Sequence, residues 1–556
     1  MSGAGADKAR LASDAPVPRR DLVRVVLASS AGTIFEAYDF ILFGSLAGLI
    51  SHKFFAGVDE TQAFIFTLLT FAAGFVVRPL GALVFGRMGD KGGRKRTFLI
   101  TITLMGGATI AIGLLPTFET AGIAAPILLI AVRLIQGLAY GGEYGGAVIY
   151  TAEHAPLGRR GLYVGWIQAA AGFALFLSLF VIDMTRTSVG EEAFSDWGWR
   201  IPFLLSAILL VLSLWIRSSL DESPAFRRML AEGKLSKRPL SEAFLTWANL
   251  RLVLMVLFGM MAVQGVLWYT AHFYTQFFIV QILGLSEASA TRVLMVVALT
   301  SVPLYLLFSW LSDRIGRKPI MLAGMILSIL TLFPAFHLLT QTVNPALERA
   351  AAAAPVVIAV RPGQCAPQFR LFGGPEYRTP CETAQTLLSR SGIPYDVRDG
   401  DGATAIAIGR ERIEVQDFAA IPADGKQAAL DGFRQELLAR LAAAGYPVKA
   451  KATEVDIVLI YAIILALVTF SVMVYAPIPA LVVEVFPARI RYSALSLPYH
   501  IGSGWFGGFL PAIAFMITAA TGSIYANLWY PLSVTALGVI VLAFLPERRD
   551  EAFRLD

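Results

Sequence analysis

Charged residues are scarce in this sequence. They make up 15% of its 556 residues, whereas 56% are hydrophobic, and the mean hydropathy is +0.65. Soluble proteins carry about 25% charged residues, so most of this chain is not expected to face water. Runs of roughly 20 apolar residues recur, which is the length that crosses a bilayer core of about 30 Å. The composition therefore predicts a polytopic membrane protein.

Several functional signatures are also missing. The sequence has no Walker phosphate-binding loop, which disfavours an ATP-driven pump. The basic N-terminal stretch has neither an apolar core nor a cleavage site, so no cleaved signal peptide is expected. The two cysteines have no zinc-site spacing and no histidine near them. We expect no metal, no cofactor and no catalytic residues.

Twelve apolar spans divide into two sets of six, with a basic linker at 218–249 between them. This pattern predicts an all-α membrane protein of two six-helix bundles, the first in 1–217 and the second in 250–344 together with 454–547. The spans are expected at 23–50, 62–86, 97–115, 123–150, 161–184, 198–217, 250–281, 289–311, 319–341, 455–484, 490–518 and 524–545.

Lysine and arginine crowd every second short loop. Under the positive-inside rule, both termini and the central linker are predicted to be cytoplasmic. The net charge of +6 is then a consequence of membrane topology, and no nucleic-acid partner is expected. The expected location is the bacterial inner membrane, with the lipid bilayer as surroundings and the chain as a monomer.

Residues 345–453 are too polar to span a membrane. They follow the ninth span and precede the tenth, so we expect them outside, as a small α/β insertion domain. Segments 355–360 and 403–409 resemble short strands, and 427–444 has helical periodicity. Cys365 and Cys381 both lie here, 16 positions apart. A disulfide in an oxidising exterior would stabilise the domain by about 3 kcal/mol; the alternative is two free thiols.

Two loops repeat one pattern: an Asp at a helix end, a glycine turn and a basic pair. The first runs from Gly86 to Arg96 and the second from Ser309 to Lys318. Their equivalent positions in the two sets predict two similar bundles with a cavity between them. A carboxylate would be attracted to a helix N-terminus across the bundle. We therefore predict that these loops gate the cavity through Asp90, Arg94, Asp313 and Arg317.

Further motifs lie along the chain at 32–40 (GTIFEAYDF), 78–81 (RPLG), 133–137 (RLIQG), 141–146 (GGEYGG), 152–154 (AEH), 197–203 (WGWRIPF), 222–224 (ESP) and 484–492 (EVFPARIRY). The repeated loop resembles the signature of the major facilitator superfamily, and these motifs resemble its metabolite–proton symporter family. Relatives carry citrate, 2-oxoglutarate, shikimate, aromatic acids, or proline and betaine. The resemblance implies a twelve-helix major facilitator fold, and it does not extend to the insertion.

Ionisable residues inside apolar spans are costly and therefore functional candidates. Glu36 and Asp39 are three apart on one helix face, and a buried carboxyl takes up a proton readily. Either is a candidate proton carrier; the alternative is a permanent pair with an arginine. Arg133 needs a carboxylate partner, which would be an anionic substrate or one of these two acids.

Further binding candidates surround these groups. Arg78 offers a second anchor for an anion, and helix 7 offers polar and aromatic groups that would orient a small ligand. Glu143 lies among glycines that are explained by tight helix packing, so its gating role competes with a structural one. The remaining substrate candidates are Tyr38, Gln264, Tyr269 and His272.

The leading hypothesis is proton-coupled uptake of a small organic acid by alternating access. One alternative is transport of a zwitterion such as proline or a betaine. Another is a receptor in which the insertion binds a ligand. An enzyme is disfavoured because the insertion contains no histidine, metal cluster or nucleophile pair. Sodium in place of the proton is not excluded by composition.

Overall fold

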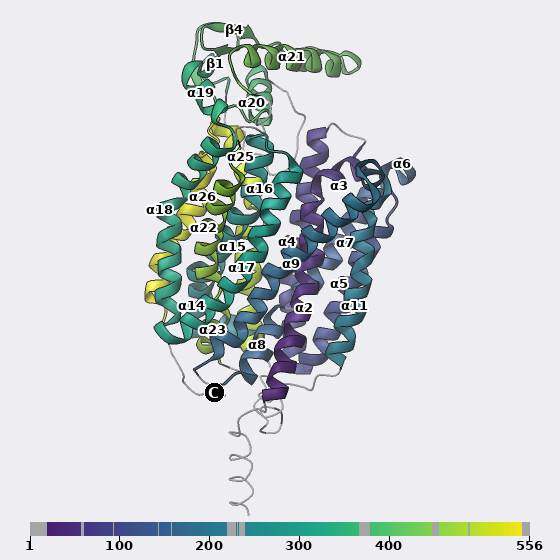
Figure 1. The fold of residues 1–556 in the computed structure, drawn as a ribbon, viewed down its shortest axis with the longest axis vertical. Helices are drawn as coiled ribbons and strands as arrows, with labels where there is room; N and C mark the ends of the chain where they lie inside the picture. The colour runs from purple at the N-terminus through teal and green to yellow at the C-terminus, as the bar shows by residue number, and fades with distance from the viewer. Residues whose placement is uncertain are drawn as a thin grey trace, which may run out of the picture.

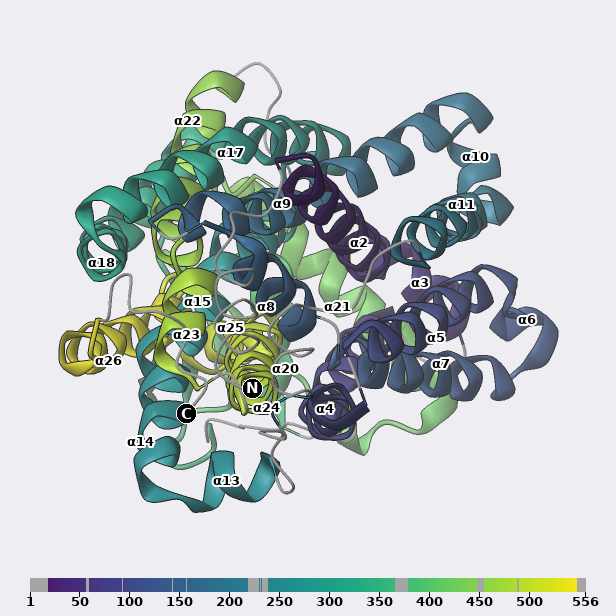
Figure 2. The same cartoon turned by 90° about the horizontal axis from the view of Figure 1, so that it is seen from below.

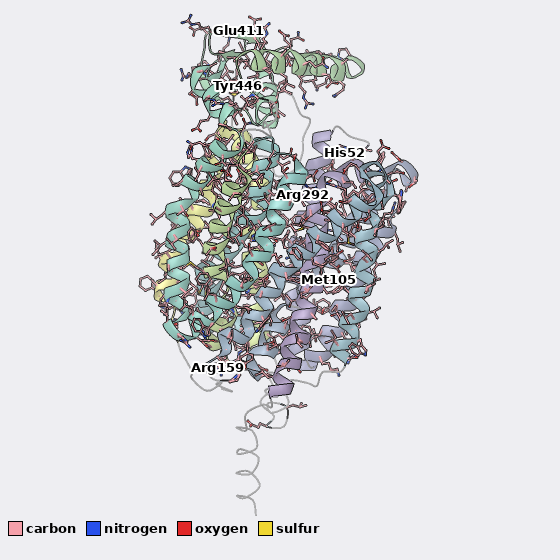
Figure 3. The ribbon with its side chains drawn as sticks, in the orientation of Figure 1. His52, Met105, Arg159, Arg292, Glu411 and Tyr446 are labelled. Carbon is pink, nitrogen blue, oxygen red and sulfur yellow. A yellow bond between two sulfur atoms is a disulfide. The ribbon has the colours of Figure 1, made fainter. Side chains whose placement is uncertain are left out.

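The computed structural model describes residues 19–56, 60–92, 94–142, 144–156, 158–218, 230, 232, 239–365, 379–447, 455–487 and 490–547. The fold is a bundle of long helices with a small α/β insertion at one end (Figure 1). Figure 3 marks Tyr446 within the insertion and Arg159 at the opposite end of the bundle. We call these two ends the insertion end and the gate end.

The first half of the chain forms one six-helix bundle. Its long helices are α2 (Arg19–Ser45), α4 (Glu60–Gly92), α5 (Arg94–Leu114), α7 (Ala124–Tyr140) with α8 (Tyr144–His154), α9 (Arg160–Val189) and α11 (Arg200–Ser218). Four short helices connect them: α3 (Ala47–Phe54), α6 (Phe118–Ala121), α10 (Glu191–Ala193) and the π-helix η1 (Phe194–Gly198).

The second half forms the other bundle, in which two helices contain π-helical segments. Helix 7 runs through α14 (Trp247–Val256), η2 (Leu257–Met261), α15 (Ala262–Tyr269), η3 (Thr270–Tyr274), α16 (Thr275–Phe277) and η4 (Phe278–Ile282). Helix 11 runs through α24 (Arg491–Tyr499), η6 (His500–Gly507) and α25 (Leu510–Thr521). The others are α13 (Pro239–Leu245), α17 (Glu287–Ile315), α18 (Arg317–Val343), α22 (Ile457–Tyr475), α23 (Ile478–Val485), η7 (Ala526–Leu528) and α26 (Trp529–Phe544).

The helices match the predicted architecture of apolar spans. In the described part of the chain, ten are long and apolar enough to cross a membrane, or eleven if a pair bent by 62° is one span. In addition, α4 is 33 residues long and takes the place of the second expected span. The two bundles meet where α9 packs along α17 and where α4 packs along α24 and η6. Figure 2 shows them side by side, viewed along the bundle.

The insertion is built on a four-stranded sheet of order β2-β1-β3-β4. Its elements are α19 (Pro345–Ala353), β1 (Val356–Val360), α20 (Pro380–Arg390), β2 (Asp396–Asp399), β3 (Ala405–Ile408), β4 (Glu411–Glu414), η5 (Phe418–Ala420) and α21 (Ala423–Ala443). Strands β1 and β2 are parallel and are joined by α20, whereas β3 pairs antiparallel with both β1 and β4. Ile358 of β1 lies opposite Val397 of β2 and Ile406 of β3.

The strands at 355–360 and 403–409 and the helix at 427–444 are confirmed by β1, β3 and α21. Strands β2 and β4 escape prediction because they read Asp-Val-Arg-Asp and Glu-Arg-Ile-Glu. An edge strand has one free side, so its residues are not forced into a hydrophobic alternation. All four residues of β2 are indeed exposed.

Candidate substrate and gate sites

Close packing of α4 against α7 brings two arginines together. A Cβ atom at Gly81 would lie 2.0 Å from the Leu138 carbonyl oxygen, and one at Gly137 would lie 2.1 Å from that of Gly74. Only glycine permits such an approach of two backbones. The glycines of the 78–81 and 133–137 motifs therefore set the distance between the helices that carry Arg78 and Arg133.

Both guanidinium groups lie in an aromatic cage. The Arg78 Cζ atom is 4.2 Å from the ring centroids of Phe40 and Phe75 and 3.9 Å from that of Tyr140. The Arg133 Cζ atom is 4.0 Å from the Phe43 centroid and 5.4 Å from that of Phe40. Ring faces attract cations, so the cage holds the two charges without neutralising them.

The two arginines have unused hydrogen-bonding capacity. Arg133 donates to Gln136 Oε1, and Gln136 Nε2 donates in turn to Thr109 Oγ1 at 2.7 Å. However, Nε and Nη2 of Arg133 and Nε of Arg78 have no partner within the described protein. Their residues are 1% and 3% exposed. Buried donors are nearly always paired, and in the described ranges neither arginine belongs to an ion pair.

The second bundle faces this cage with two polar rings. Tyr269 of α15 lies 5.8 Å from the Phe75 ring centroid, and its hydroxyl interacts with the Arg78 guanidinium. His500, at the start of η6, lies 5.9 Å from the Tyr140 ring. It is fully buried, and neither ring nitrogen has a hydrogen-bond partner among the described residues. A backbone group of Gly141 lies near the ring, outside hydrogen-bond geometry.

We call Arg78, Arg133, Tyr140, Tyr269 and His500 the central cluster. Its residues come from both bundles, and those with orphaned polar atoms are the ones expected to meet a polar ligand. Three of the five, Arg78, Arg133 and Tyr269, are among the substrate candidates predicted from sequence. His500 and Tyr140 were not predicted. The rule for ionisable residues in apolar spans applies to His500 and would have identified it.

The other predicted substrate residues are engaged elsewhere. The Tyr38 hydroxyl donates to the Pro202 carbonyl at 2.9 Å, so it faces α11 and not the central cluster. His272 Nδ1 bonds the Trp268 carbonyl oxygen at 2.9 Å, and its ring stacks on Trp268. This is the satisfied histidine of a helix interior. Gln264 is buried on α15, and its Oε1 has no hydrogen-bond partner in the described structure.

The two predicted proton carriers are buried on α2. Glu36 is 3% exposed and Asp39 is fully buried. Asp39 directly precedes Phe40, so α2 carries both a carboxyl group and a wall of the aromatic cage. The alternative in which Arg133 is permanently paired with either acid is not observed, because Arg133 has no ion-pair partner among the described residues.

The second repeated loop ties the two bundles together at the gate end. Asp313, near the end of α17, accepts hydrogen bonds from the backbone nitrogens of Gly161 and Leu162, each at 2.8 Å. These are N-terminal groups of α9, which favour a negative charge. Arg317 lies 2.6 Å from Asp313 and 3.1 Å from Glu484. The contact between a carboxylate and a helix N-terminus is the one predicted from sequence.

The first repeated loop makes an equivalent contact in the opposite direction. Asp90 Oδ2 accepts a hydrogen bond from Ser493 Oγ at 2.7 Å and one from its backbone nitrogen at 3.3 Å. Ser493 is in the first turn of helix 11. Nearby, Arg491 pairs with Glu153 of α8 at 3.3 Å. Each bundle thus holds a helix N-terminus of the other, and both connections are closed.

Two predicted gating groups lie outside the described residues. Glu143 is one, and the side chain of Arg94 is the other.

Cys365 and Cys381 are joined by a disulfide, with Cα atoms 5.6 Å apart.

Comparison with known proteins identifies the family of the chain. The model of the Major Facilitator Superfamily matches residues 30–359. The chain belongs to the major facilitator superfamily. It is 36% identical to the shikimate transporter of Escherichia coli (strain K12) over 318 residues, covering 56% of this chain and 72% of that one. It is 34% identical to the proline/betaine transporter of the same organism over 334 residues, covering 58% and 66%.

Solved structures agree on the fold. The proton:xylose symporter XylE bound to 6-bromo-6-deoxy-D-glucose superposes with a TM-score of 0.60 at 15% identity, covering 96% of this chain and 97% of that one. This major facilitator protein is therefore a multi-pass membrane transporter and not an enzyme. The twelve-helix fold and the metabolite-symporter resemblance are both confirmed.

The position of Tyr38 leads to a first prediction. Tyr38→Phe removes only the hydrogen bond to Pro202, which is worth about 0.5–1.5 kcal/mol in stability, and leaves the central cluster intact. Transport should therefore stay within about fivefold of the wild-type rate, because less than 1 kcal/mol of any loss would reach the site. Uptake assays in membrane vesicles would measure it. A loss comparable to that of Arg133→Ala would return Tyr38 to the substrate site.

Proposed function

We propose that this chain is a proton-coupled symporter that carries a small organic acid across the bacterial inner membrane by alternating access. The observation that supports it is the pair of buried arginines with unpaired N–H groups at the junction of the two bundles. Guanidinium groups bind carboxylates through paired, charge-assisted hydrogen bonds. A substrate carboxylate would satisfy Arg133 Nη2 and Nε, which have no partner among the described residues.

An acid fits these residues better than a zwitterion. Aromatic cages also bind quaternary ammonium groups, and the name of the proline/betaine transporter includes such a compound, betaine. Here, however, the faces of Phe40, Phe43 and Phe75 are already covered by guanidinium groups. A second cation would meet the charges of Arg78 and Arg133 at close range, where like charges repel strongly.

Alternating access fits the two closed connections at the gate end. The Asp90–Ser493 and Asp313–α9 contacts each join the two bundles. They consist of hydrogen bonds, and the Arg491–Glu153 ion pair joins the bundles beside them. Such contacts have discrete made and broken states and so suit a two-state gate. Four residues of the central cluster are buried and Tyr140 is half-buried, so the substrate would be enclosed until one end opens.

The expected orientation puts the gate end and both termini in the cytoplasm and the insertion outside. Charge placement supports it: the basic loops follow α4 and α17 at the gate end. The protein would work as a monomer, because each chain holds both bundles and a complete central cluster. Glu36 and Asp39 would carry the proton.

Purified protein in liposomes would test the function. Labelled shikimate, 2-oxoglutarate and glycine betaine would be offered with an acidic exterior and no sodium. We expect one of the acids to accumulate. A protonophore, which dissipates the pH gradient, should abolish this accumulation. Accumulation of betaine alone, or uptake that requires sodium and ignores the pH gradient, would contradict the proposal.

The buried carboxyls allow a separate prediction. Glu36→Gln and Asp39→Asn mimic the protonated state. One of these two variants replaces the residue that carries the proton. In that variant, uptake driven by the pH gradient should fall at least about tenfold, the effect of roughly 1.4 kcal/mol. Exchange of internal for external substrate should continue, because it needs no net proton movement. Loss of exchange in both variants would mean that these acids hold the fold or bind substrate.

A further inference from the structure

The disulfide of the insertion occupies a particular place in its fold. Strand β1 leads into a turn at Gly363, whose φ is 81°, with Gln364 N donating to Arg361 O at 3.1 Å. Cys365 follows the turn and is bonded to Cys381, the second residue of α20. The disulfide therefore lies where a parallel strand ends and its crossover helix begins. In open sheets with parallel strands, this edge is where reactive and binding groups gather.

The two sulfur atoms have different surroundings. Cys381 is 1% exposed in the first turn of α20, where Thr379 Oγ1 accepts a hydrogen bond from Glu382 N at 3.2 Å. Cys365 is half-buried, next to an exposed turn. A helix N-terminus stabilises a thiolate. An attacking thiolate would therefore reach the sulfur of Cys365 and displace Cys381 as a thiolate that the helix favours.

The same part of the insertion is seated on helices 7 and 11. Gly392, just after α20, has a φ of 66°, and a Cβ atom there would lie 2.4 Å from the carbonyl oxygen of Ile282, the last residue of η4. Tyr395 N donates to the carbonyl oxygen of Gly522 at 3.1 Å, directly after α25. A Cβ atom at Gly522 would lie 2.2 Å from the backbone carbonyl oxygen of Tyr395.

These contacts connect the disulfide with the central cluster. Helix 7 carries Tyr269 and helix 11 carries His500, and α20 packs against α25. The ends of helices 7 and 11 thus contact the residues that follow α20, and the first turn of α20 is fixed by the disulfide. A change in the order of α20 would loosen the contacts at the ends of helices 7 and 11, which must move for the site to open.

We propose that Cys365–Cys381 is a thiol–disulfide switch that controls transport through α20. A protein dithiol of the thioredoxin class attacks the Cys365 sulfur, and the Cys365–Cys381 bond breaks as a mixed disulfide forms. The second thiol of the reductant then attacks the mixed disulfide. In this second step the reductant closes its own disulfide and the Cys365 sulfur leaves as a thiolate. The two thiol protons of the reductant end on Cys365 and Cys381, so both cysteines are reduced and the reductant leaves oxidised. The reduced insertion releases helices 7 and 11, so the transport rate rises.

The test uses the full chain in liposomes, with dithiothreitol as the reductant and maleimide labelling to count free thiols. We expect reduction to raise the rate about fivefold, at the low end of measured couplings between sites. The Cys365→Ser/Cys381→Ser variant should have the high rate throughout and ignore the reductant. An unchanged wild-type rate with both thiols labelled would overturn the proposal, as would a disulfide that resists reduction in the folded protein.

A pair of glycine variants keeps the test independent of the cysteines. Gly392→Ala, with its disulfide intact, places a methyl group against Ile282 and should raise the rate and remove the response. Gly445→Ala is the matched control, because Gly445 also has a positive φ, of 91°, but a Cβ there meets nothing within 4 Å. It should respond as the wild type does. If Gly392→Ala and Gly445→Ala have the same transport rate and the same response to the reductant, the insertion does not act through its contacts with helices 7 and 11.

The proposal relies on the proposed transport function for its rate measurement, but not for its structural one. Hydrogen exchange of 278–282 and 518–522 should increase on reduction even if the transported compound is not among those tested. Absence of all uptake together with this increase would count against the proposed function alone. Absence of the increase, with transport intact, would count against the switch alone.

Discussion

Uptake by Arg133→Ala is expected to fall at least about 100-fold while the protein still inserts and folds. Removing one partner of a buried, charge-assisted contact costs about 3–5 kcal/mol, and each 1.4 kcal/mol is a factor of ten. The loss should appear as an absence of substrate binding, because Nε and Nη2 of Arg133 are buried in the central cluster without a hydrogen-bond partner in the described protein. Binding would be measured by thermal shift with the acid that wild-type protein transports.

Arg133→Lys is the informative companion to this variant. Lysine keeps the positive charge but loses the planar fork that binds a carboxylate through two bonds. It also cannot cover the Phe43 ring in the same way. We expect an intermediate loss, with weaker binding than the wild type and clear uptake at high substrate concentration. Wild-type rates in Arg133→Ala would remove Arg133 from the substrate site and the organic-acid proposal with it.

The second large effect is expected at the gate. Asp313→Asn removes the charge that pairs with Arg317, and an amide group cannot accept with both of its atoms the bonds from Gly161 and Leu162. Breaking a buried pair of this kind costs about 3–5 kcal/mol. The equilibrium should move toward an open gate end by at least about 100-fold, and net uptake should fall because the protein no longer closes there.

Cysteine labelling would show this opening directly. Ser309, fully buried beside the gate, donates to the Ala476 carbonyl oxygen, and a Ser309→Cys reporter should react slowly with maleimide. The reaction should be much faster in combination with Asp313→Asn. Glu287→Gln is the control, since it neutralises an exposed acid at the other end of the same helix. Equal labelling with and without Asp313→Asn would mean that this contact does not hold the gate closed.

The spans and the gate contacts were predictable because their signals are local. An apolar run shows its own length, and the Asp-Gly-Arg pattern around Asp313 places its carboxylate at a helix end. Only the helix that it caps, α9, is distant in sequence. The general attraction between carboxylates and helix N-termini was enough to predict that kind of contact, although not which helix would receive it.

The central cluster was predictable only in part. Arg78 and Arg133 are charges in apolar spans, which identifies them without a fold. The contact of Tyr38 with Pro202 could not be predicted, because the direction of a side chain depends on how its helix is rotated against α11, which no local pattern records. The aromatic cage escaped for the opposite reason: phenylalanines are ordinary in membrane helices, and only the close approach of α4 and α7 gives Phe40 two guanidinium neighbours.

The π-helical segments of helices 7 and 11 have a mechanical consequence. A π-turn contains one residue more than an α-turn, so η2, η3, η4 and η6 each store an extra residue in the helix. If such a turn relaxes or shifts along the axis, the rest of the helix moves by one residue, about 1.5 Å and 100°. Tyr269 and His500 lie at the boundaries of these turns. The second bundle can therefore change the register of helices 7 and 11 by one residue, which would turn the rings of Tyr269 and His500 that face the arginines without unfolding either helix.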